Sequence, residues 1–422
     1  MATGEVIWGY IEDNKFMTLI VQKYGGSSLA DVGQIKNVVG RITQVRDRGD
    51  QVVVVVSAMG DTTDELLKLA YQVAERPADR ELDVLLSTGE LISSTLLSMS
   101  LNHMGYEAIS LSGAQAGIRT NASYSRAMIV DIDPERMFKE MEKGRIVIVA
   151  GFQGITEEKD ITTLGRGGSD TTAVALAVSL KAEECQIYTD VEGIYTADPH
   201  LVTEARKLLQ IGYDEMLELA SYGARVIHPR AVELGELFDI PIMVASSFTD
   251  NPGTLIDGGA SMEVSNKVRG VAHDFDVAKV TVVGVPDSSG ISAAIFEPLA
   301  MANISIDTIV QAPSVAGTTD LTFTVSRNQL GKAMDVVKPI ASSIGARDCT
   351  SDFKLGKVSI IGIGMQNTPG YAARMFKALS EGGINIHVIS TSEIRITCII
   401  DENRVDDAVH ALHRAFELEK ND

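Results

Sequence analysis

Five consecutive valines, residues 52–56, place the strongest limit on how this 422-residue chain can fold. An unbroken β-branched run is typical of a strand that is buried on both faces, as in the middle of a parallel sheet. Other apolar runs recur along residues 17–260, and amphipathic helical patterns separate them. This alternation predicts an α/β fold with a mostly parallel sheet.

The expected strands lie at 18–23, 52–58, 107–111, 145–151, 184–190 and 241–246. The expected helices lie at 31–48, 64–75, 80–103, 134–143, 170–181, 212–222 and 228–238. In open sheets of this kind, ligands bind outside the carboxyl ends of the strands. The strand ends are therefore where functional residues are expected.

A glycine-rich turn follows the first expected strand and leads into the first expected helix. It carries Lys23 and then the small residues Gly25, Gly26, Ser27 and Ser28. In such a turn, backbone N–H groups converge on an anion, with the helix N-terminus behind them and a lysine to add positive charge. No Walker A pattern occurs anywhere in the chain. Taken alone, the turn is equally consistent with an ordinary βα connection that needs small residues.

A second small-residue loop, at 165–170, opens another expected helix. It carries one cation, Arg166, and Ser169 or Asp170 can cap the helix. Two glycine-rich loops with one cation each form a pair of anion sites. Phosphoryl transfer needs such an arrangement, because the protein contributes mainly positioning and charge neutralisation.

Beyond a Gly- and Pro-rich linker at 247–260, the chain contains an internal repeat. Residues 280–310 resemble 358–389, and each copy predicts a strand, a turn, a helix and a second strand. Third strands are expected at 319–325 and 394–400, with final helices at 328–341 and 403–416. The pattern predicts two ferredoxin-like βαββαβ units. Such units bind ligands or only mediate dimerisation.

Charge and composition exclude several classes of protein. The chain has 37 Lys and Arg against 57 Asp and Glu, a net charge of -20, which argues against nucleic acid. No apolar run reaches the roughly 18 residues of a membrane span, and no signal pattern occurs at the start. The three cysteines are far apart and suit reduced core thiols in a cytoplasm.

Several motifs taken together resemble those of the aspartokinases, over residues 17–418. They are KYGGSS, SAMGDTTDE, STGE, TTLGRGGSDTTA, YTDVEGIYTADP and the C-terminal repeat. Aspartokinases transfer the γ-phosphoryl group of ATP to the β-carboxylate of L-aspartate and give 4-phospho-L-aspartate. This reaction is the first step toward lysine, threonine, methionine and diaminopimelate.

The resemblance implies a particular fold and domain order. The expected fold is that of the amino acid kinases, a three-layer sandwich with a mostly parallel sheet, followed by two ACT domains. The expected segments are an extension at 1–16, a catalytic domain at 17–260 and ACT domains at 261–350 and 351–422. ATP with Mg²⁺ is the implied cofactor, the metal being carried on the phosphates with water rather than by a protein metal site. A cytoplasmic location is implied as well.

Site residues follow from the matched motifs. Lys23 is expected to stabilise charge on the transferring group, and Asp170 to orient Lys23 and the phosphates. Glu90 is expected to meet the substrate ammonium and Arg166 a substrate carboxylate, which suits a planar guanidinium. The residues matched to the ATP site are Lys23, Gly25, Gly26, Ser27, Thr189, Asp190, Tyr195, His200 and Arg225. Those matched to the aspartate site are Ser57, Thr63, Glu90, Arg166, Gly167, Gly168 and Ser169.

Lysine, threonine or both are the implied effectors, bound by the ACT repeats. The matched residues are Asp287, Ser292, Asp307, Gln311, Tyr371, Ala372, Asn385, Ile386, Ser392 and Glu393. The first repeat departs from the family pattern at Ser289, where proline is usual, and at Ala312, where asparagine is usual. Near the nucleotide, His200 replaces the usual arginine and Arg225 the usual lysine. These departures leave the effector and the details of ATP binding open.

Other readings of single residues remain. Glu90 could be a carboxylate on a helix surface, and Asp170 could be only a helix cap. His410 and His413 lie one turn apart on the last expected helix and predict a solvated face rather than a metal site.

Other functions and assemblies also remain open. One alternative is another amino acid kinase, such as a glutamate or acetylglutamate kinase, and a second is an inactive amino-acid sensor. The assembly is expected to be a homo-oligomer or, if an internal start at Met262 gives a separate regulatory chain, an α2β2 complex through the ACT domains.

Overall fold

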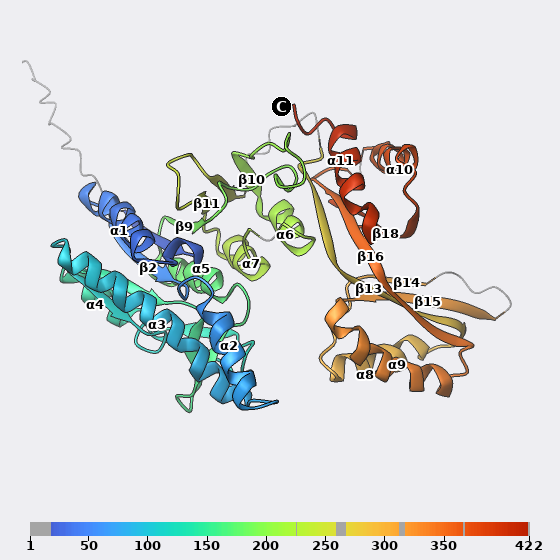
Figure 1. Ribbon diagram of the computed structural model, residues 1–422, viewed down its shortest axis with the longest axis horizontal. Helices are drawn as coiled ribbons and strands as arrows, with labels where there is room; N and C mark the ends of the chain where they lie inside the picture. Colours follow the sequence, from blue (N-terminus) through green and yellow to red (C-terminus); the bar gives the residue numbers. More distant parts are fainter. Residues whose placement is uncertain (1–17, 225, 259–266, 312–316, 366–367, 421–422) are drawn as a thin grey trace, which may run out of the picture. The chain divides into compact units, whose positions relative to one another are not determined.

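The computed structural model describes residues 18–224, 226–258, 267–311, 317–365 and 368–420 (Figure 1). The chain forms two compact units. The first contains the chain up to Glu192 together with Arg230–Gly258. The second contains Gly193–Pro229 and everything from Gly259 onward. A segment from the middle of the sequence therefore folds with the C-terminal repeats.

The first unit is built on a sheet in which strands run in the order β12-β11-β9-β1-β2-β6-β3. The bounds are β1 Leu19–Tyr24, β2 Gln51–Val56, β3 Ala108–Leu111, β6 Ile146–Ala150, β9 Glu184–Thr189, β11 Ile242–Ser246 and β12 Thr254–Asp257. All neighbouring pairs are parallel except β11 with β12. The predicted parallel sheet is confirmed, and the valine run is its strand β2, between β1 and β6.

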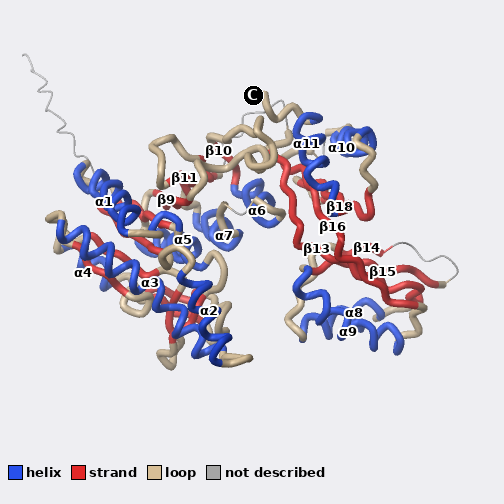
Figure 2. The backbone as a smooth tube through the Cα atoms, viewed as in Figure 1, coloured by secondary structure: helices blue, strands red, loops and turns tan. Residues whose placement is uncertain are grey.

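Helices cover both faces of this sheet (Figure 2). Their bounds are α1 Val32–Asp47, α2 Thr62–Val73, α3 Asp79–His103, α4 Glu135–Glu142, α5 Gly168–Leu180 and α7 Pro229–Phe238. On one face, Val52, Val54 and Val56 form a buried core with side chains of α1 and α3, among them Val38 and Leu97. On the other face, α5 packs against β1, β2 and β9 and is buried along most of its length. The three-layer prediction is thereby confirmed.

The first unit also contains a second, four-stranded sheet, which the sequence pattern does not predict. Its order is β5-β4-β7-β8, with bounds β4 Ile118–Thr120, β5 Ile129–Ile132, β7 Gln153–Ile155 and β8 Ile161–Thr163. Strands of three or four residues are too short to show a period of two, so the pattern could not predict them. This sheet matters because β8 leads directly into the loop that carries Arg166.

The second unit contains a six-stranded sheet in the order β14-β15-β13-β16-β18-β17. Its strands are β13 Gly270–Pro286, β14 Ile309–Gln311, β15 Thr318–Val325, β16 Asp348–Ile361, β17 Ile386–Thr391 and β18 Arg395–Asp401. Its helices from the repeats are α8 Ile291–Met301, α9 Leu330–Ser343, α10 Tyr371–Glu381 and α11 Val405–Ala415. The two ferredoxin-like units that the repeat predicts are present.

The two repeats share their central strands. The last part of β13 and the first part of β16 pair within the first repeat, as in Val282 with Cys349. The last part of β16 belongs to the second repeat, and there its partner is the first part of β13, as in His273 with Val358. The strand that completes the second repeat therefore precedes the first repeat in the sequence.

Residues from the middle of the chain, including β10 (Gln210–Gly212) and α6 (Tyr213–Ser221), belong to the second unit. Ala197 and Val202 join the core of the second repeat. His413 on α11 is 1% exposed, and its Nε2 lies 3.0 Å from Thr196 Oγ1. The predicted solvated face is therefore wrong for His413, because this segment covers that side of the helix.

Helix α3 is the one described helix that is long and apolar enough to cross a membrane, by length and composition alone. Half of its apolar window is buried inside the protein, and the buried residues of α3 include Asp83 and Glu90. These are features of a core helix. Among the cysteines, Cys185 and Cys398 are buried and Cys349 is half-buried, and all three are free.

Candidate active site

Lys23 and Asp170 form an ion pair at the carboxyl edge of the parallel sheet. Lys23 Nζ lies 2.7 Å from Asp170 Oδ1, and the two side chains are 10% and 11% exposed. Lys23 is the second-to-last residue of β1, and Asp170 lies in the first turn of α5. A carboxylate is favoured at a helix N-terminus, and a buried lysine needs a charged partner. The pair thus fixes a positive charge between two strand-to-helix turns.

The turn after β1 packs tightly on the turn after β2. Gly26 O accepts a hydrogen bond from Gly60 N at 3.0 Å, and a side chain at Gly26 would meet Ala58 O and Gly60 O at 3.0 Å. Gly25 N donates to Tyr188 O of β9 at 3.1 Å. Small residues are therefore required at this turn because of close backbone approach. Ser27 begins the short 3-10 helix that follows.

Serine hydroxyl groups join the end of β2 to the start of α5. Ser57 Oγ and Ser169 Oγ lie 2.8 Å apart, and Ser57 N donates to Tyr24 O at 3.1 Å. A side chain at Gly151 would come within 3.0 Å of Ser169 Cβ. Gly151 was not among the predicted site residues, although it directly follows β6. Thr63, in the first turn of α2, is half-buried.

Glu90 is a buried carboxylate on α3. Its Oε1 accepts a hydrogen bond from Ala58 N at 3.2 Å, whereas Oε2 has no hydrogen-bond partner among the described residues. Burial raises the pKa of Glu90 to about 8, against the opposing effect of the backbone hydrogen bond. An arriving ammonium group would supply the missing partner and favour the ionised form. The reading of Glu90 as a surface carboxylate is wrong.

Arg166 lies in the turn that joins β8 to α5 and is exposed. The glycines on either side of it, Gly165 and Gly167, have φ of 77° and 65°. Positive φ is strained for other residues, so the turn requires glycine on both sides of the arginine. A side chain at Gly168 would come within 2.8 Å of Phe152, which explains a third glycine.

The end of β9 completes this edge of the sheet. Thr189 Oγ1 donates to Asp190 Oδ1 at 3.0 Å, and Thr189 O accepts from Ser247 N at 2.9 Å. Ser247 also shares a hydrogen bond of 2.8 Å with Ser28. Ser247 was not predicted, because it follows β11, far along the sequence from the glycine-rich turn.

Two further residues matched to the ATP site, Tyr195 and His200, belong to the second unit. Tyr195 pairs with Lys207 in an isolated bridge, and His200 N donates to Asp198 Oδ1 at 2.8 Å, both in the second unit. Arg225 lies outside the described residues, as does Ala312.

The residues matched to the effector form two groups in the second unit. Gln311 lies in β14 and Ile386 in β17, at opposite edges of the six-stranded sheet. The first group is Asp287, Ser292, Asp307 and Gln311, and the second is Tyr371, Ala372, Asn385, Ile386, Ser392 and Glu393. Gln311 and Ile386 are therefore far apart within one chain, whereas Asp307 and Ser392 both approach α6, since Tyr222 bonds Asp307 and Glu218 accepts from Ser392 Oγ at 3.4 Å.

Asp307 belongs to a charged network around Tyr222. Lys357 Nζ lies 2.9 Å from Asp307 Oδ2, and the Tyr222 hydroxyl donates to Oδ1 at 3.2 Å. Burial alone would raise the pKa of Asp307, but Lys357 and Tyr222 hold it below its ordinary value. Arg395 lies 3.9 Å from the Tyr222 ring centre and pairs with Glu218 of α6 at 2.9 Å. The network holds α6 on the sheet of the repeats.

Comparison with known proteins identifies the family. The model of the amino acid kinase family matches residues 18–246, and that of the ACT domain matches 280–339 and 358–416. An aspartokinase of Bacillus sp. (strain MGA3) is 49% identical over 402 residues, which is 95% of this chain and 98% of that protein.

Solved structures agree with this relationship. E. coli aspartokinase III in complex with aspartate and ADP, in the R-state, aligns with TM-score 0.78 and 25% identity, over 94% of this chain and 99% of that one. Its complex with lysine and aspartate, in the T-state, aligns with TM-score 0.72 and 26% identity, over the same shares. Together with the fold and the paired repeats, these matches show that the chain belongs to the aspartokinases of the amino acid kinase family.

Proposed function

We propose that the first unit transfers the γ-phosphoryl group of ATP to the β-carboxylate of L-aspartate, through the Lys23 and Asp170 pair. The observation that carries this proposal is the 2.7 Å contact between these side chains, with a glycine-rich turn on each side. The complex of E. coli aspartokinase III with aspartate and ADP supports both substrates. The product would be 4-phospho-L-aspartate, a precursor for lysine, threonine, methionine and diaminopimelate.

Lys23 and Asp170 have separate roles in this proposal. The Lys23 ammonium group has three N–H donors, so it can keep its bond to Asp170 while it donates to a phosphoryl oxygen. Asp170 holds the Lys23 ammonium group in place at the strand ends. As the phosphoryl group leaves ATP, Lys23 stabilises the negative charge on its oxygens, which is the main task of a phosphoryl-transfer site. Backbone N–H groups of Gly26 and Ser27 hold the other phosphates, and Gly25, whose N–H donates to Tyr188 O, lets the chain approach them closely.

Glu90 and Arg166 hold the aspartate. The substrate ammonium group binds the buried Glu90 carboxylate, whose Oε2 has no described partner. The exposed guanidinium of Arg166 binds a substrate carboxylate with two parallel hydrogen bonds. Ser57 and Ser169, whose hydroxyl oxygens are 2.8 Å apart, and Thr63 border the acceptor. Glutamate, which is one methylene longer, would place its terminal carboxylate differently.

Magnesium would enter with ATP. Mg²⁺ keeps several waters and is bound by phosphates with one or two carboxylates. Asp170 and Asp190 supply carboxylates at the edge where β1 and β9 end. Bound Mg²⁺ would neutralise phosphate charge. We propose no dedicated metal site made of protein side chains alone.

Regulation by lysine, threonine or both is proposed for the second unit. The complex of E. coli aspartokinase III with lysine supports an amino-acid effector. Among the matched residues, Asp307 is bonded to Lys357 of β16 and to Tyr222, which directly follows α6. An effector ammonium group that binds Asp307 competes with Lys357 and loosens α6, which precedes the matched nucleotide residue Arg225 in sequence.

An assembly of several chains is proposed from the positions of the matched effector residues. The matched effector residues Gln311 and Ile386 lie at opposite edges of one sheet. A site that uses both of these residues needs a second chain, in a homo-oligomer or in an α2β2 complex with a chain that starts at Met262. Met262 lies outside the described residues. Detection of only the full-length chain in native extract would exclude the α2β2 form. A cytoplasmic location is proposed on the basis of the reduced cysteines.

The test is an aspartyl-hydroxamate assay with Mg-ATP, with and without lysine and threonine. Formation of the hydroxamate from aspartate, and not from glutamate or acetylglutamate, is the expected result. Product from one of these acids and none from aspartate would overturn the proposal. No product from any acid, with retained binding of lysine or threonine, would instead favour an inactive sensor.

A further inference from the structure

The position of Arg166 depends on the backbone around it. Its side chain is exposed, and no hydrogen bond or ion pair is described for it in the parts of the chain that the structure covers. The turn itself, Leu164–Gly167, is held by other residues. Thr163 O accepts from Ala127 N at 2.9 Å, and Leu164 N donates to Phe152 O at 2.9 Å. What fixes this turn therefore fixes where the Arg166 guanidinium can reach.

Arg230, at the start of α7, ties two segments of this region together. Its Nη1 donates to Leu164 O at 2.8 Å, and its Nη2 donates to Ala127 O at 3.1 Å. The side chain is half-buried, and burial lowers the pKa of Arg230, against the effect of Glu233. The partly buried guanidinium of Arg230 thus binds two backbone carbonyl groups. One of them belongs to Leu164, two residues before Arg166.

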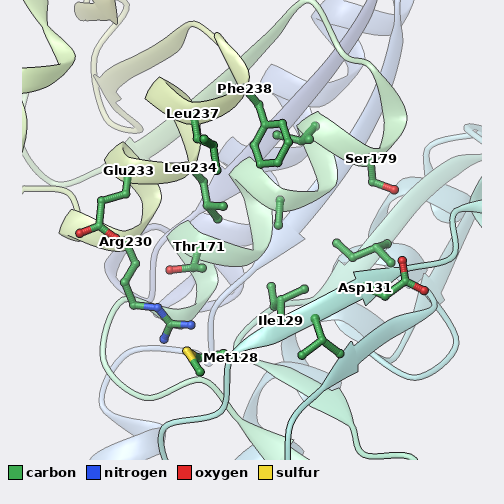
Figure 3. Close-up of a pocket in the computed structure, with 14 residues that line it drawn as sticks. Met128, Ile129, Asp131, Thr171, Ser179, Arg230, Glu233, Leu234, Leu237 and Phe238 are labelled. Carbon is green, nitrogen blue, oxygen red and sulfur yellow. The ribbon is translucent and has the colours of Figure 1, made fainter.

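Figure 3 shows Arg230 extending from α7 toward Met128, at one end of a groove. The groove has a volume of about 640 Å³ and lies between β5, α5 and α7. Its other lining side chains are mostly apolar, among them Leu234, Leu237 and Phe238. The guanidinium therefore lies beside a poorly polar surface, where its hydrogen bonds to the two carbonyl groups are worth more than in water.

Asp83 holds the same region from α3. It is 0% exposed and accepts hydrogen bonds from Ser125 N at 2.9 Å, Thr163 N at 2.8 Å and Thr163 Oγ1 at 2.6 Å. A side chain at Gly165 would come within 2.9 Å of Ser125 O, so this segment also touches the turn directly. Asp83 and Arg230 thus hold the segments at 125–127 and 163–164 from two separate helices.

We propose that Arg230, supported by Asp83, is a positioning residue that sets the aspartate affinity through the Arg166 turn. The inference rests on the proposed role of Arg166. A planar guanidinium can donate to two carbonyl groups at once, which a lysine ammonium at the end of a flexible chain does not reproduce. Without this clamp, Arg166 samples positions that fit the substrate carboxylate less well. A displacement of about 1 Å in a binding group is enough to weaken its contribution strongly.

The test compares Arg230→Met and Arg230→Lys with the unaltered full-length enzyme. We expect KM for aspartate to rise about tenfold, as for loss of charged hydrogen bonds, while KM for ATP and kcat stay within about twofold. A rise in both KM values together, or an unchanged KM for aspartate, would overturn the proposal. Ethylguanidinium added to Arg230→Ala should lower KM for aspartate again, which a merely destabilised fold would not show.

Arg46 offers a matched control. It also donates to two backbone carbonyl groups, Asp50 O at 3.1 Å and Gly144 O at 3.2 Å, but these precede β2 and β6, at the amino edge of the sheet. Arg46→Met should change neither KM. If it raises KM for aspartate as much as Arg230→Met does, the effect is one of general stability and the proposal fails.

Arg166→Ala separates this inference from the proposed function. If Arg166→Ala raises KM for aspartate and Arg230→Met does not, the positioning role fails and the role of Arg166 stands. If Arg166→Ala leaves KM for aspartate unchanged, the proposed role of Arg166 fails and takes the inference with it. When both changes act through the same turn, the double variant should be no worse than Arg166→Ala alone.

Discussion

Two lysine–aspartate pairs, one in each unit, show how much the surroundings of an ion pair decide what it can do. Lys23 and Asp170 are 2.7 Å apart, and Lys357 and Asp307 are 2.9 Å apart. The two lysine side chains are buried to nearly the same degree, 10% and 8% exposed. By distance and burial alone the pairs are alike.

Their neighbours differ. Lys23 is followed by Gly25 and Gly26, so its end of the strand has backbone groups and small hydroxyl groups around it. Lys357 lies within β16, 5.3 Å from the Tyr222 ring centre and 3.8 Å from Asp274. In the proposed function, the first pair leaves the lysine with N–H donors for a ligand that brings its own charge. The second pair holds separate parts of the polypeptide together.

The largest expected effect tests the first pair. Lys23→Ala should lower kcat by roughly 10² or more, because the charge on the transferring phosphoryl group loses its stabilising cation. Steady-state assays with Mg-ATP and aspartate measure this, and Lys36→Ala, which removes an exposed lysine of α1, is the control. A change in KM with unchanged kcat would contradict the role of Lys23.

The second pair is tested through stability. Lys357→Met should lower the free energy of unfolding by about 2 kcal/mol, because Asp307 keeps its charge in a partly buried place without its cation. Urea unfolding followed by circular dichroism measures the loss. Adding Asp307→Asn should recover part of it. If the single variant is as stable as the parent, the Lys357 and Asp307 pair does not hold these parts of the polypeptide together.

Glu90 sharpens the contrast, because it is a carboxylate without a lysine. Its pKa of about 8 means that the unfolded chain holds fewer protons than the folded one between pH 4.5 and about 8. Rising pH in that range therefore lowers stability. Ionised Glu90 is also the form that binds an ammonium group, so KM for aspartate should fall about tenfold from about pH 6.5 to about pH 8.

Glu90→Gln is the matching variant. It should weaken aspartate binding and remove the pH dependence of KM for aspartate. The stability of the variant should also fall less as pH rises. Measurement of KM for aspartate and of the melting temperature across this pH range covers both effects. An unchanged pH profile of KM in the variant would contradict the assignment of Glu90 to the substrate ammonium.

The smallest effect concerns Tyr222. Tyr222→Phe keeps the ring near Lys357 and Arg395 but removes the hydroxyl group that donates to Asp307. The network loses one hydrogen bond, worth about 1 kcal/mol. The lysine or threonine concentration that gives half-inhibition should fall about fivefold, because Asp307 is held less tightly by its own partners and binds the effector more readily. Identical inhibition curves for the variant and the parent would show that the network does not report on the effector.

The sequence was a good guide wherever local pattern and burial agree. The valine run predicted β2 within two residues, because a strand buried on both faces leaves little choice of residue. The rule that ligands bind at the carboxyl ends of strands directed attention to one edge, where the structure places Lys23 beside Asp170 and Ser57 beside Ser169. The roles assigned to these residues stay predictions.

The sequence was a poor guide where the partner is a backbone group or a distant segment. Asp83 and Arg230 bond mainly to backbone N–H and C=O groups, which leave no trace in residue identity. His413 looked exposed because its helix was considered without Thr196, which lies far away in the sequence. The strand that completes the second repeat was missed for the same reason, since it stands before the first repeat.

That shared strand has a consequence for how the second unit can be divided. Because β13 and β16 each contribute residues to both repeats, the two repeats are not independent consecutive domains. Removal of the first repeat alone would leave the second with an unpaired strand edge, and separate expression of either repeat should give aggregation-prone protein. A chain that starts at Met262 would keep both long strands and so the whole sheet, but it would lack Tyr222 and Thr196. Such a chain would fold with Lys357, Arg395 and His413 deprived of partners that only the longer chain provides.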